Sequence, residues 1–242
     1  MDYKLLELDT ELFGFKVAKI LLPQLSLVEL QTILNELHKQ NIRLVYWPSD
    51  STDEKSQQAA KKLGGFLGSE HITYLLDLKT LDPYPLVAPE VEVYERRLKP
   101  APTDIELEQL AVLAGTYSHF NTDPNFSKEL FLKLYHVWIE NSVNGSVASR
   151  ILVIRNNNKI VGMITLGTKN NRGDIGLLAV NANFRGKNFG AKLVSAAQAY
   201  FIELGFFQAQ VVTQKANVPA CRLYEKCNFH QEKIENFYHF WL

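Results

Sequence analysis

Apolar residues in the first third of the chain recur in two alternating patterns, which predict a succession of strands and helices. Short β-rich runs separate segments in which apolar residues return at helical spacing after a capping side chain. We expect strands at 15–21, 42–47 and 72–78, with helices after Ser26 and after Thr52 or Asp53. Pro48 is expected to end the second strand, and Gly64-Gly65 the second helix. This βαβαβ order predicts a small α/β domain over residues 1–88.

A proline-rich stretch follows this unit. Pro83, Pro85 and Pro89 lie within residues 79–90, and proline disfavours both a helix and an interior strand. We interpret the stretch as a linker and predict that a second domain covers residues 89–242.

The second domain alternates the same two patterns over a longer distance. Strands are expected at 91–95, 149–155, 159–167, 174–180, 208–213 and 237–242. Helices are expected after Thr103 and Asp104, after Ser127, at 190–204 and at 217–226. A polar loop, 118–126, separates the first two helices. Asn156-Asn157-Asn158 is expected to turn a hairpin, because asparagine tolerates a positive φ. The predicted order is β-α-α-β-β-β-α-β-α-β.

Residues 177–193 combine an apolar strand, a short basic loop and the start of a helix. The first N–H groups of a helix have no intrahelical partner, and the helix dipole favours an anion there. Gly186 and Gly190 allow close approach of the backbone, while Arg185 and Lys187 add positive charge. The stretch therefore predicts a phosphate-binding site.

The composition restricts what that site can bind. Hydrophobic residues make up 46% and charged residues 21%, the usual mix of a globular protein with a real core. Lys plus Arg and Asp plus Glu are both 26, so the formal net charge is zero. A nucleic-acid or membrane-surface binder needs a basic excess, so we expect neither kind of partner. A local basic loop suits a small anionic ligand.

The two cysteines and residues 1–9 indicate in which cell compartment the protein is expected. Cys221 and Cys227 are too few for a disulfide framework, and with His230 they do not complete a metal-ligand set. Acidic residues interrupt positions 1–9, where a signal peptide needs an apolar run, and no stretch approaches the roughly 20 apolar residues of a membrane span. We expect a cytoplasmic protein with no metal and no membrane span.

Two motifs in the second domain resemble those of the GNAT acyl-CoA N-acetyltransferase family. The first, residues 185–191, is similar to the family's Arg/Gln-x-x-Gly-x-Gly/Ala, with Asn188 at the first glycine position. The second, residues 217–229, resembles Asn-x-x-Ala-x-x-Leu-Tyr-x-Lys-x-Gly-Phe, with Asn228 at its glycine. The resemblance implies the GNAT fold: a mixed, mostly antiparallel sheet flanked by helices, here preceded by a smaller α/β N-terminal domain.

The resemblance also implies acetyl-CoA as cosubstrate. The basic loop is expected to hold the pyrophosphate of the cosubstrate. The preceding strand is expected to hold its pantetheine arm and acetyl carbonyl, and Asn217 to form a further hydrogen bond to that arm. The cofactor-binding residues so assigned are Leu178, Ala179, Val180, Arg185, Gly186, Lys187, Asn188, Phe189, Gly190, Ala191 and Asn217.

Tyr224 is the predicted general acid. It lies seven residues after Asn217, two helical turns along, so both side chains project from nearly one face. A phenol carries a proton at neutral pH that it can give to a departing sulfur. The general base stays open between Asp174, His119 and a water molecule.

A closer resemblance concerns the acceptor. Residues 12–15, 138–141 and 175–179 look like those of GNAT enzymes that acetylate a dTDP-linked amino-deoxy sugar for a bacterial surface polysaccharide. We expect this small molecule to bind at the turn after Phe13 and at the loop 118–126, where Tyr117 or Phe120 would stack on it; packing in the core is the alternative. The predicted substrate residues are Phe13, His119, Phe120 and Asn121.

Other functions fit the same sequence. A GNAT enzyme for another small amine or a protein N-terminus is one alternative, and a CoA-binding module without catalysis is another. The aromatic strand at 237–242 would either close a homodimer or complete the sheet of one chain.

Overall fold

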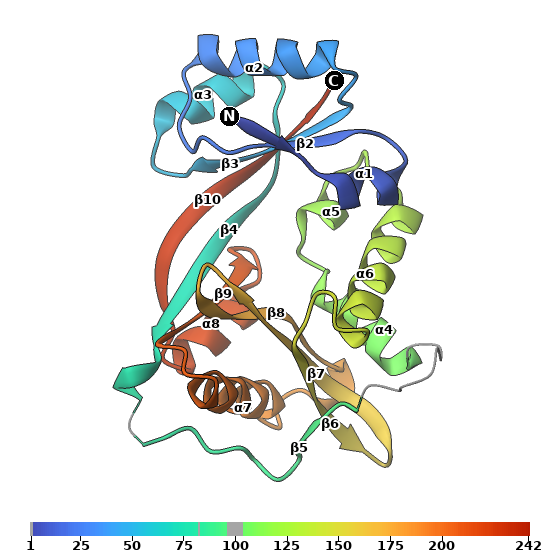
Figure 1. Ribbon diagram of the computed structural model, residues 1–242, viewed down its shortest axis with the longest axis vertical. Helices are drawn as coiled ribbons and strands as arrows, with labels where there is room; N and C mark the ends of the chain where they lie inside the picture. The colour runs from blue at the N-terminus through green and yellow to red at the C-terminus, as the bar shows by residue number, and fades with distance from the viewer. Residues whose placement is uncertain (1, 82, 96–103) are drawn as a thin grey trace.

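The computed structural model describes residues 2–81, 83–95 and 104–242; Thr103, a predicted helix cap, lies outside them. These residues form one mixed sheet of ten strands flanked by helices (Figure 1). The strands are β1 (Tyr3–Leu5), β2 (Val17–Ile20), β3 (Leu44–Asp50), β4 (Phe66–Asp77), β5 (Val91–Val93), β6 (Arg150–Asn156), β7 (Lys159–Lys169), β8 (Arg172–Val180), β9 (Gln208–Gln214) and β10 (His230–Trp241). The helices are α1 (Glu7–Phe13), α2 (Leu27–Lys39), α3 (Glu54–Lys62), α4 (Ile105–Ala114), α5 (His119–Thr122), α6 (Lys128–Val143), α7 (Phe189–Glu203) and α8 (Val218–Lys226), with 3₁₀ turns at Leu78–Thr80 and Ala182–Phe184.

The order of the strands is β1-β2-β3-β10-β4-β9-β8-β7-β6-β5. Only β2–β3 and β8–β9 are parallel among the described pairs, which confirms the predicted mixed, mostly antiparallel sheet. The α and β elements predicted after residue 89 occur in the predicted order.

Strand β10 lies in the middle of this sheet. It pairs antiparallel with β3 on one side and with β4 on the other, and β4 in turn pairs with β9. One continuous sheet therefore runs through both predicted domains, while the division into 1–88 and 89–242 stays a prediction. Of the two roles considered for the aromatic terminal strand, the structure places it in the sheet of its own chain.

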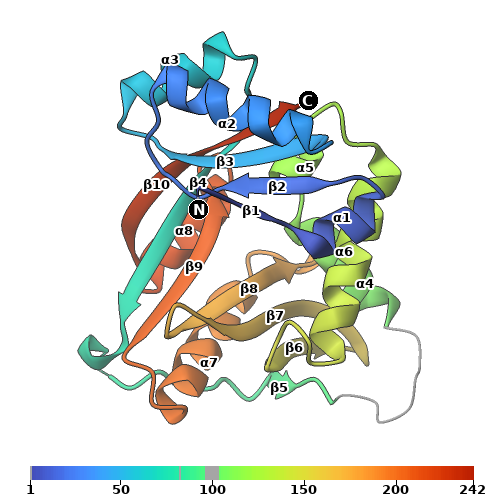
Figure 2. The ribbon, with the colours of Figure 1, turned by 45° about the horizontal axis from the view of Figure 1, so that its top comes forward.

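Alternate residues of each strand face two different helical layers (Figures 1 and 2). On one face, Trp47 and Phe240 pack under α2 and α3, and the same face carries Ile72 and Val211 under α7 and α8. On the other face, α1 and α5 cover β3 and β10, and α4 and α6 cover β6 to β8. The cavity described below is lined from both faces, by the end of α4 on one and by α7 and α8 on the other.

Three local expectations are wrong. Strand β3 continues through Pro48 to Asp50, because β2 pairs only with residues 44–46 and the missing N–H of the proline meets no neighbouring strand. The segment 7–13, for which no helix was predicted, forms α1 even though Leu6 supplies no side-chain cap. The predicted loop 118–126 contains the short helix α5.

Asparagine fills the left-handed backbone positions of this chain. Every non-glycine residue with positive φ in the described ranges is an asparagine. Asn157 and Asn158 turn the β6–β7 hairpin as predicted, and Asn170 and Asn171 turn the next one. Asn188, at φ 62°, and Asn228, at φ 69°, confirm that these two residues adopt the conformation usually left to glycine.

Candidate active site

Strands β8 and β9 separate part-way along their length. They pair only where Gly173, Asp174 and Ile175 face residues 209–211, although β8 continues to Val180 and β9 to Gln214. Ile175 and Leu178 of β8 pair with Leu166 and Ile164 of β7. The segment of β8 between these pairs is one residue longer than the segment of β7, so β8 contains a bulge at this point. The bulge and the separation open a gap in the middle of an otherwise continuous sheet.

A cavity of about 880 Å³ lies at the end of β8, where the two strands have separated. It is lined by the end of β8, the loop and first turn of α7, helix α8 with its Asn217 cap, and the end of α4 with the residues that follow it. Every predicted cofactor-binding residue except Lys187 lies in its lining. Lys187 is exposed and its ammonium lies 5.1 Å from the centre of the Phe184 ring. The lining also includes Leu113, Ala114, Thr116, Tyr117, Phe184, Pro219, Ala220, Leu223 and Lys226.

The loop 185–191, called the amide loop below, presents a row of backbone donors. Within the described structure, no acceptor is found for the N–H groups of residues 186–191. Left-handed conformations at Gly186 and Asn188 bend the loop into the start of α7. Consecutive free amides at a helix N-terminus form an anion site, so the amide loop has the geometry that the phosphate prediction required.

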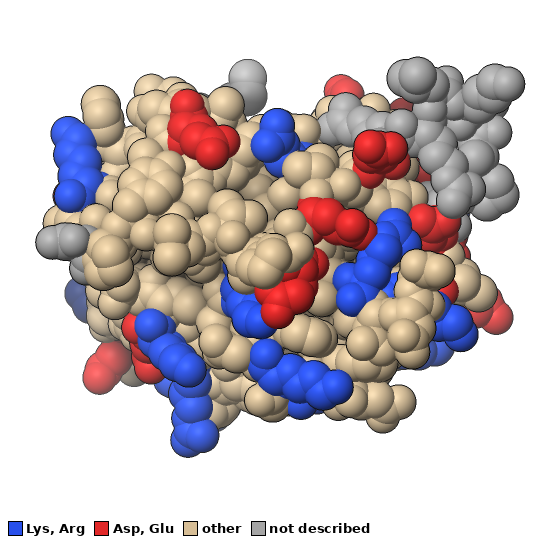
Figure 3. Space-filling view, turned by 90° about the horizontal axis from the view of Figure 1, so that it is seen from below, with Lys and Arg blue, Asp and Glu red and all other residues tan. Residues whose placement is uncertain are grey.

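Charge around the amide loop is local. The Arg185 Nε donates to the carbonyl of Val180 at 3.4 Å, which holds this guanidinium near the cavity. Figure 3 shows basic and acidic side chains interspersed over the face seen from below, without a broad field of one sign. A small anion would be held by the amides and one or two neighbouring cations.

The end of β8 turns backbone groups toward the gap. Asn181 donates its N–H to the carbonyl of Val161 on β7. Because the backbone groups of successive residues in a strand point to opposite sides, those of Leu178 and Val180 point away from β7. Their N–H and C=O groups therefore face the space that β9 has left. This is the placement expected for groups that hold an extended pantetheine-like chain.

Helix α8 borders the cavity with its first turn. The Asn217 side chain caps the helix by accepting from the Ala220 N–H at 3.3 Å, and Asn217 also lines the cavity. Tyr224, two turns later, is 4% exposed and packs against Tyr74 and Phe229 rather than in the lining. Burial raises the pKa of the Tyr224 hydroxyl, which therefore stays protonated at neutral pH.

The predicted substrate residues lie together in part. The Phe13 ring, from α1, is 6.1 Å from that of Phe120, which is 3.9 Å from the His119 ring. Phe13 and His119 are buried, so both belong to the core between α1, α5 and the sheet. Asn121 is exposed and its amide donates to the Thr116 carbonyl, which ties α5 to the segment that lines the cavity.

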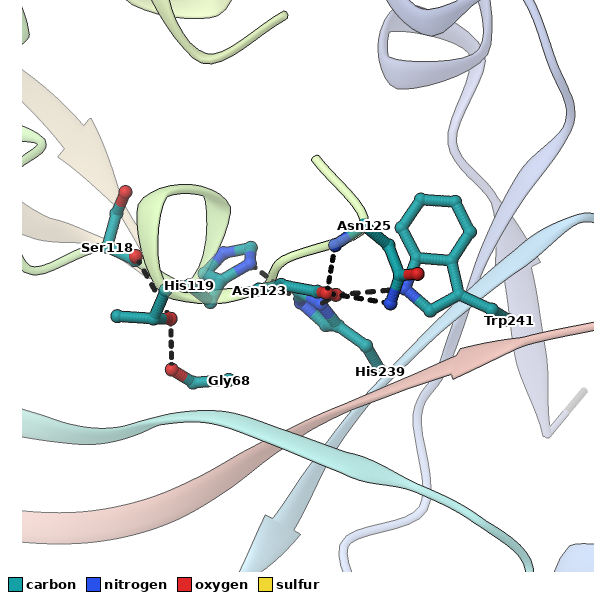
Figure 4. A network of polar contacts seen from close by, with 8 residues as sticks. Gly68, Ser118, His119, Asp123, Asn125, His239 and Trp241 are labelled. Carbon is teal, nitrogen blue, oxygen red and sulfur yellow. Dashed lines mark hydrogen bonds and ion pairs between the residues drawn. The ribbon is translucent and has the colours of Figure 1, made fainter. Parts of the chain in front are cut away.

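His119 also belongs to a buried polar network (Figure 4). Its Nδ1 lies 2.8 Å from Nε2 of His239, and Nδ1 of His239 lies 2.6 Å from Oδ2 of Asp123. Trp241 Nε1 donates to the same oxygen at 2.9 Å, while the backbone N–H and amide of Asn125 donate to Oδ1. We call Asp123, His239 and His119 the histidine relay.

The surroundings set the charges of this network. Burial opposes ionisation of Asp123, but hydrogen bonds from His239, Asn125 and Trp241 outweigh it and lower the pKa of the carboxyl to about 2. Burial lowers the pKa of His119 well below its ordinary value, and it lowers that of neighbouring His71 to about 4. At neutral pH the relay therefore holds one carboxylate and a neutral His119.

The second candidate base, Asp174, lies on β8 where that strand still pairs with β9. Burial raises the pKa of its carboxyl, and the amide of Gln210 donates to it at 2.8 Å. Asp174 is not part of the cavity lining.

The comparisons with known proteins cover the same elements. Residues 113–229 match the family model of the acetyltransferase (GNAT) family, a range that contains the whole lining of the cavity. This chain carries a GNAT acetyltransferase domain. Enzymes of this family use acetyl-CoA, and the free amides and the exposed β8 backbone fit its pyrophosphate and its amide-bearing arm.

Known relatives of this GNAT domain vary in similarity. The chain is 31% identical over 147 residues to the spore coat polysaccharide biosynthesis protein SpsD of Bacillus subtilis (strain 168), a match that covers 59% of the chain. The chain spans about half the length of that curated relative, 49%.

Solved structures share the fold. A GCN5-related N-acetyltransferase from Sphaerobacter thermophilus has a TM-score of 0.63 at 12% identity, covering 99% of this chain and 76% of that one. A tandem GNAT protein from the clavulanic acid biosynthesis pathway has a TM-score of 0.58 at 13% identity, covering 93% and 75%. At these identities the likeness concerns the fold alone. Separately, no helix in the described parts of the chain is long and apolar enough to cross a membrane.

The sequence did not reveal the partners of His119 in this GNAT domain. Asp123 lies in the predicted polar loop, His239 lies on the predicted aromatic strand, and His71 comes just before a predicted strand. His119 and His239 are 120 residues apart, so no local spacing connects them. The one available signal was a histidine on an otherwise apolar aromatic strand, which is costly unless it is paired.

Proposed function

We propose that this chain is an acetyl-CoA-dependent N-acetyltransferase that acetylates the amino group of a nucleotide-linked amino-deoxy sugar, with a dTDP sugar as its acceptor. The observation that carries the transferase chemistry is the row of free amides in the lining of a cavity at the end of β8, where that strand has separated from β9. The amino-sugar acceptor is supported by residues 12–15, 138–141 and 175–179, which resemble enzymes that acetylate dTDP-4-amino-4,6-dideoxygalactose. The similarity to a spore coat polysaccharide biosynthesis protein supports a role in surface polysaccharide synthesis.

Each group of residues has a role in this proposal. The amide loop and Arg185 bind the pyrophosphate, and Leu178, Val180 and Asn217 bind the arm. Bound acetyl-CoA supplies a thioester carbonyl to the acceptor amine. Tyr224 gives its proton to the sulfur that leaves; burial raises the pKa of its hydroxyl, which keeps that proton in place at neutral pH until the thiolate forms. Phe120 and Asn121 contribute to the wall on the acceptor side, and Phe13 packs behind Phe120.

The acceptor is tested with a panel of amines. The purified chain is incubated with acetyl-CoA and, separately, with dTDP-linked amino sugars, free amino sugars, polyamines and peptides with free N-termini, and release of free thiol is followed. Turnover restricted to the nucleotide-linked amino sugars is the expected result. Turnover on peptides or simple amines alone would overturn the acceptor class, and binding of acetyl-CoA without turnover on any amine would indicate a CoA-binding module.

A further inference from the structure

The donors around Asp123 fix one proton of the histidine relay. The indole N–H of Trp241 and both N–H groups of Asn125 can only donate, so the Asp123 carboxylate accepts from all of them. An ionised Asp123 requires a proton on Nδ1 of His239, at 2.6 Å. In the arrangement that makes His119 a base, Nδ1 of His119 donates to Nε2 of His239, 2.8 Å away.

This chain of donors leaves Nε2 of His119 without a proton. Across the described residues, that nitrogen has no hydrogen-bond partner, and it is not among the fully enclosed unpaired atoms, whereas Nε2 of His71 is. A lone pair is therefore available on a neutral imidazole that is otherwise buried, with the ring 7% exposed. An imidazole fixed in one tautomer by a carboxylate behind it has the arrangement of a general base.

His119 is not in the cavity lining, but it follows closely on residues that are. Thr116 and Tyr117 line the cavity, and His119 begins α5 two residues later. Asn121 donates to the Thr116 carbonyl and Thr122 to that of Gly68 on β4, so α5 is fixed between the cavity segment and the sheet. The His119 ring lies 5.5 Å from that of His71, which pairs with Gln214 at the end of β9, beside the gap.

We propose that Nε2 of His119 is the base that takes the proton from the acceptor amine, and that His239 and Asp123 position it and receive the resulting charge. This inference rests on the proposed function. An acceptor ammonium loses an N–H proton to Nε2, and its nitrogen keeps the electron pair. As the C–N bond forms, the C–S bond breaks with its pair on sulfur. One ammonium and one thioester thus give one amide, one thiol and one released proton.

The relay explains how a buried histidine can accept a proton. As Nε2 gains a proton, Nδ1 can pass its own to Nε2 of His239, so the positive charge comes to lie beside the Asp123 carboxylate instead of in the apolar interior. Groups that bear on this charge from the surrounding strands are Lys19 on β2, Tyr46 on β3 and His71 on β4. Lys19 and His71 oppose it, which leaves Asp123 as the compensating charge.

The first test needs no cofactor and no acceptor. Nitrogen-15 NMR of the histidine rings in the free protein reports which ring nitrogen carries the proton. We expect His119 as the Nδ1–H tautomer from pH 6 to 8, and His239 likewise. His239→Asn keeps a donor to Asp123 but loses the Nε2 acceptor, so His119 should then become a mixture of tautomers. A proton on Nε2 of His119 in the unmodified chain would overturn the proposal.

The second test uses His119→Asn, whose side-chain amide replaces the Nδ1 donor but supplies no base. We expect kcat to fall about 100-fold at pH 7 with the KM for acetyl-CoA unchanged. The loss of kcat in His119→Asn relative to the unmodified chain should shrink by about tenfold for each unit by which the pH is raised, because the neutral amine becomes more abundant. A purely structural role would not produce this dependence on pH. His71→Asn is the matched control, with an expected loss below about threefold.

The outcomes of the two tests separate two failures. If no nucleotide-linked amino sugar is acetylated but NMR gives the expected tautomers, the acceptor class is wrong and the relay stands. If such a sugar is acetylated and the loss in His119→Asn is independent of pH, or the loss in His71→Asn is the larger one, the relay is wrong and the proposed function stands.

Discussion

The amide loop and the histidine relay are two polar regions of the molecule that are built in different ways. The amide loop is one run of residues, 185–191, whose binding groups are backbone amides exposed by left-handed conformations and a helix start. In the relay, His119 lies on α5 and Asp123 caps the C-terminus of that helix. His239 lies on β10, 116 to 120 residues further along the chain. The first depends on local backbone geometry. The second depends on the correct assembly of the sheet, so single substitutions should affect the two parts in different ways.

The largest effect on the amide-loop side of this comparison is expected for Tyr224→Phe. If Tyr224 supplies the proton to sulfur, kcat should fall by about 100-fold or more, while the Kd for acetyl-CoA stays the same because the amide loop and the end of β8, which bind it, are unchanged. Steady-state thiol release and calorimetric titration measure the two quantities. A loss of less than about threefold in kcat would remove Tyr224 from the chemistry and leave its role to packing with Tyr74 and Phe229.

Asp123→Asn tests the relay through stability. The carboxyl is 2% exposed and accepts from His239, Trp241 and Asn125, so its replacement should lower the free energy of unfolding by about 2–3 kcal/mol. Since its folded pKa, about 2, lies below its ordinary value of 3.8, the carboxylate stabilises the fold above about pH 4. That contribution is lost as the pH falls toward 2.

Urea titrations from pH 7 to pH 2.5 measure this dependence. The unmodified chain should lose stability in the acid range more steeply than Asp123→Asn, so the two curves should approach each other. Parallel curves would mean that Asp123 does not carry the charge described for it.

A smaller effect is expected at Asn188 in the amide loop. At φ 62°, alanine should cost about 1–2 kcal/mol in a left-handed position, whereas glycine, which the family pattern has there, should cost nothing. Asn188→Ala should therefore weaken acetyl-CoA binding by about tenfold, and Asn188→Gly should leave it unchanged, both measured by calorimetry. Equal binding by the two variants would show that the backbone conformation at this position does not set affinity.

The smallest effect is expected at Lys187. The sequence predicted that it binds the cofactor, yet it lies outside the cavity lining, whereas Arg185 lies within it. Lys187→Ala should change the Kd for acetyl-CoA by less than about threefold, and Arg185→Ala should raise it by about tenfold. A larger loss for Lys187→Ala would mean that its flexible side chain reaches the ligand.

What the sequence predicted correctly is mostly local. Capping residues and apolar spacing identified α2, α3, α6 and the hairpin turned by Asn157 and Asn158. The strand, the loop and the helix start at 177–193 were recognised because a free-amide anion site needs only consecutive residues. These features depend on interactions within a few residues, which a pattern can show.

What it missed depends on distant parts of the chain. Pro48 is tolerated inside β3 because β2 is too short to reach it, and that length is not visible near Pro48. The pairing of β10 between β3 and β4, and so the meeting of His239 with Asp123 and His119, is decided by the packing of the whole sheet. His119 was among the candidate bases, but nothing nearby in the sequence identified its partners.

The place of β10 in the sheet has a consequence for folding. Its partners β3 and β4 are synthesised long before it, and until residues 230–241 emerge those two strands have an open space between them. Pairings between segments so far apart in sequence form slowly, because a long loop must close before they contribute. The chain therefore completes the amide loop and α7 earlier than the relay, whose His239 arrives with β10. A nascent chain that stalls before β10 would hold a formed amide loop while His119 and Asp123 still lack His239.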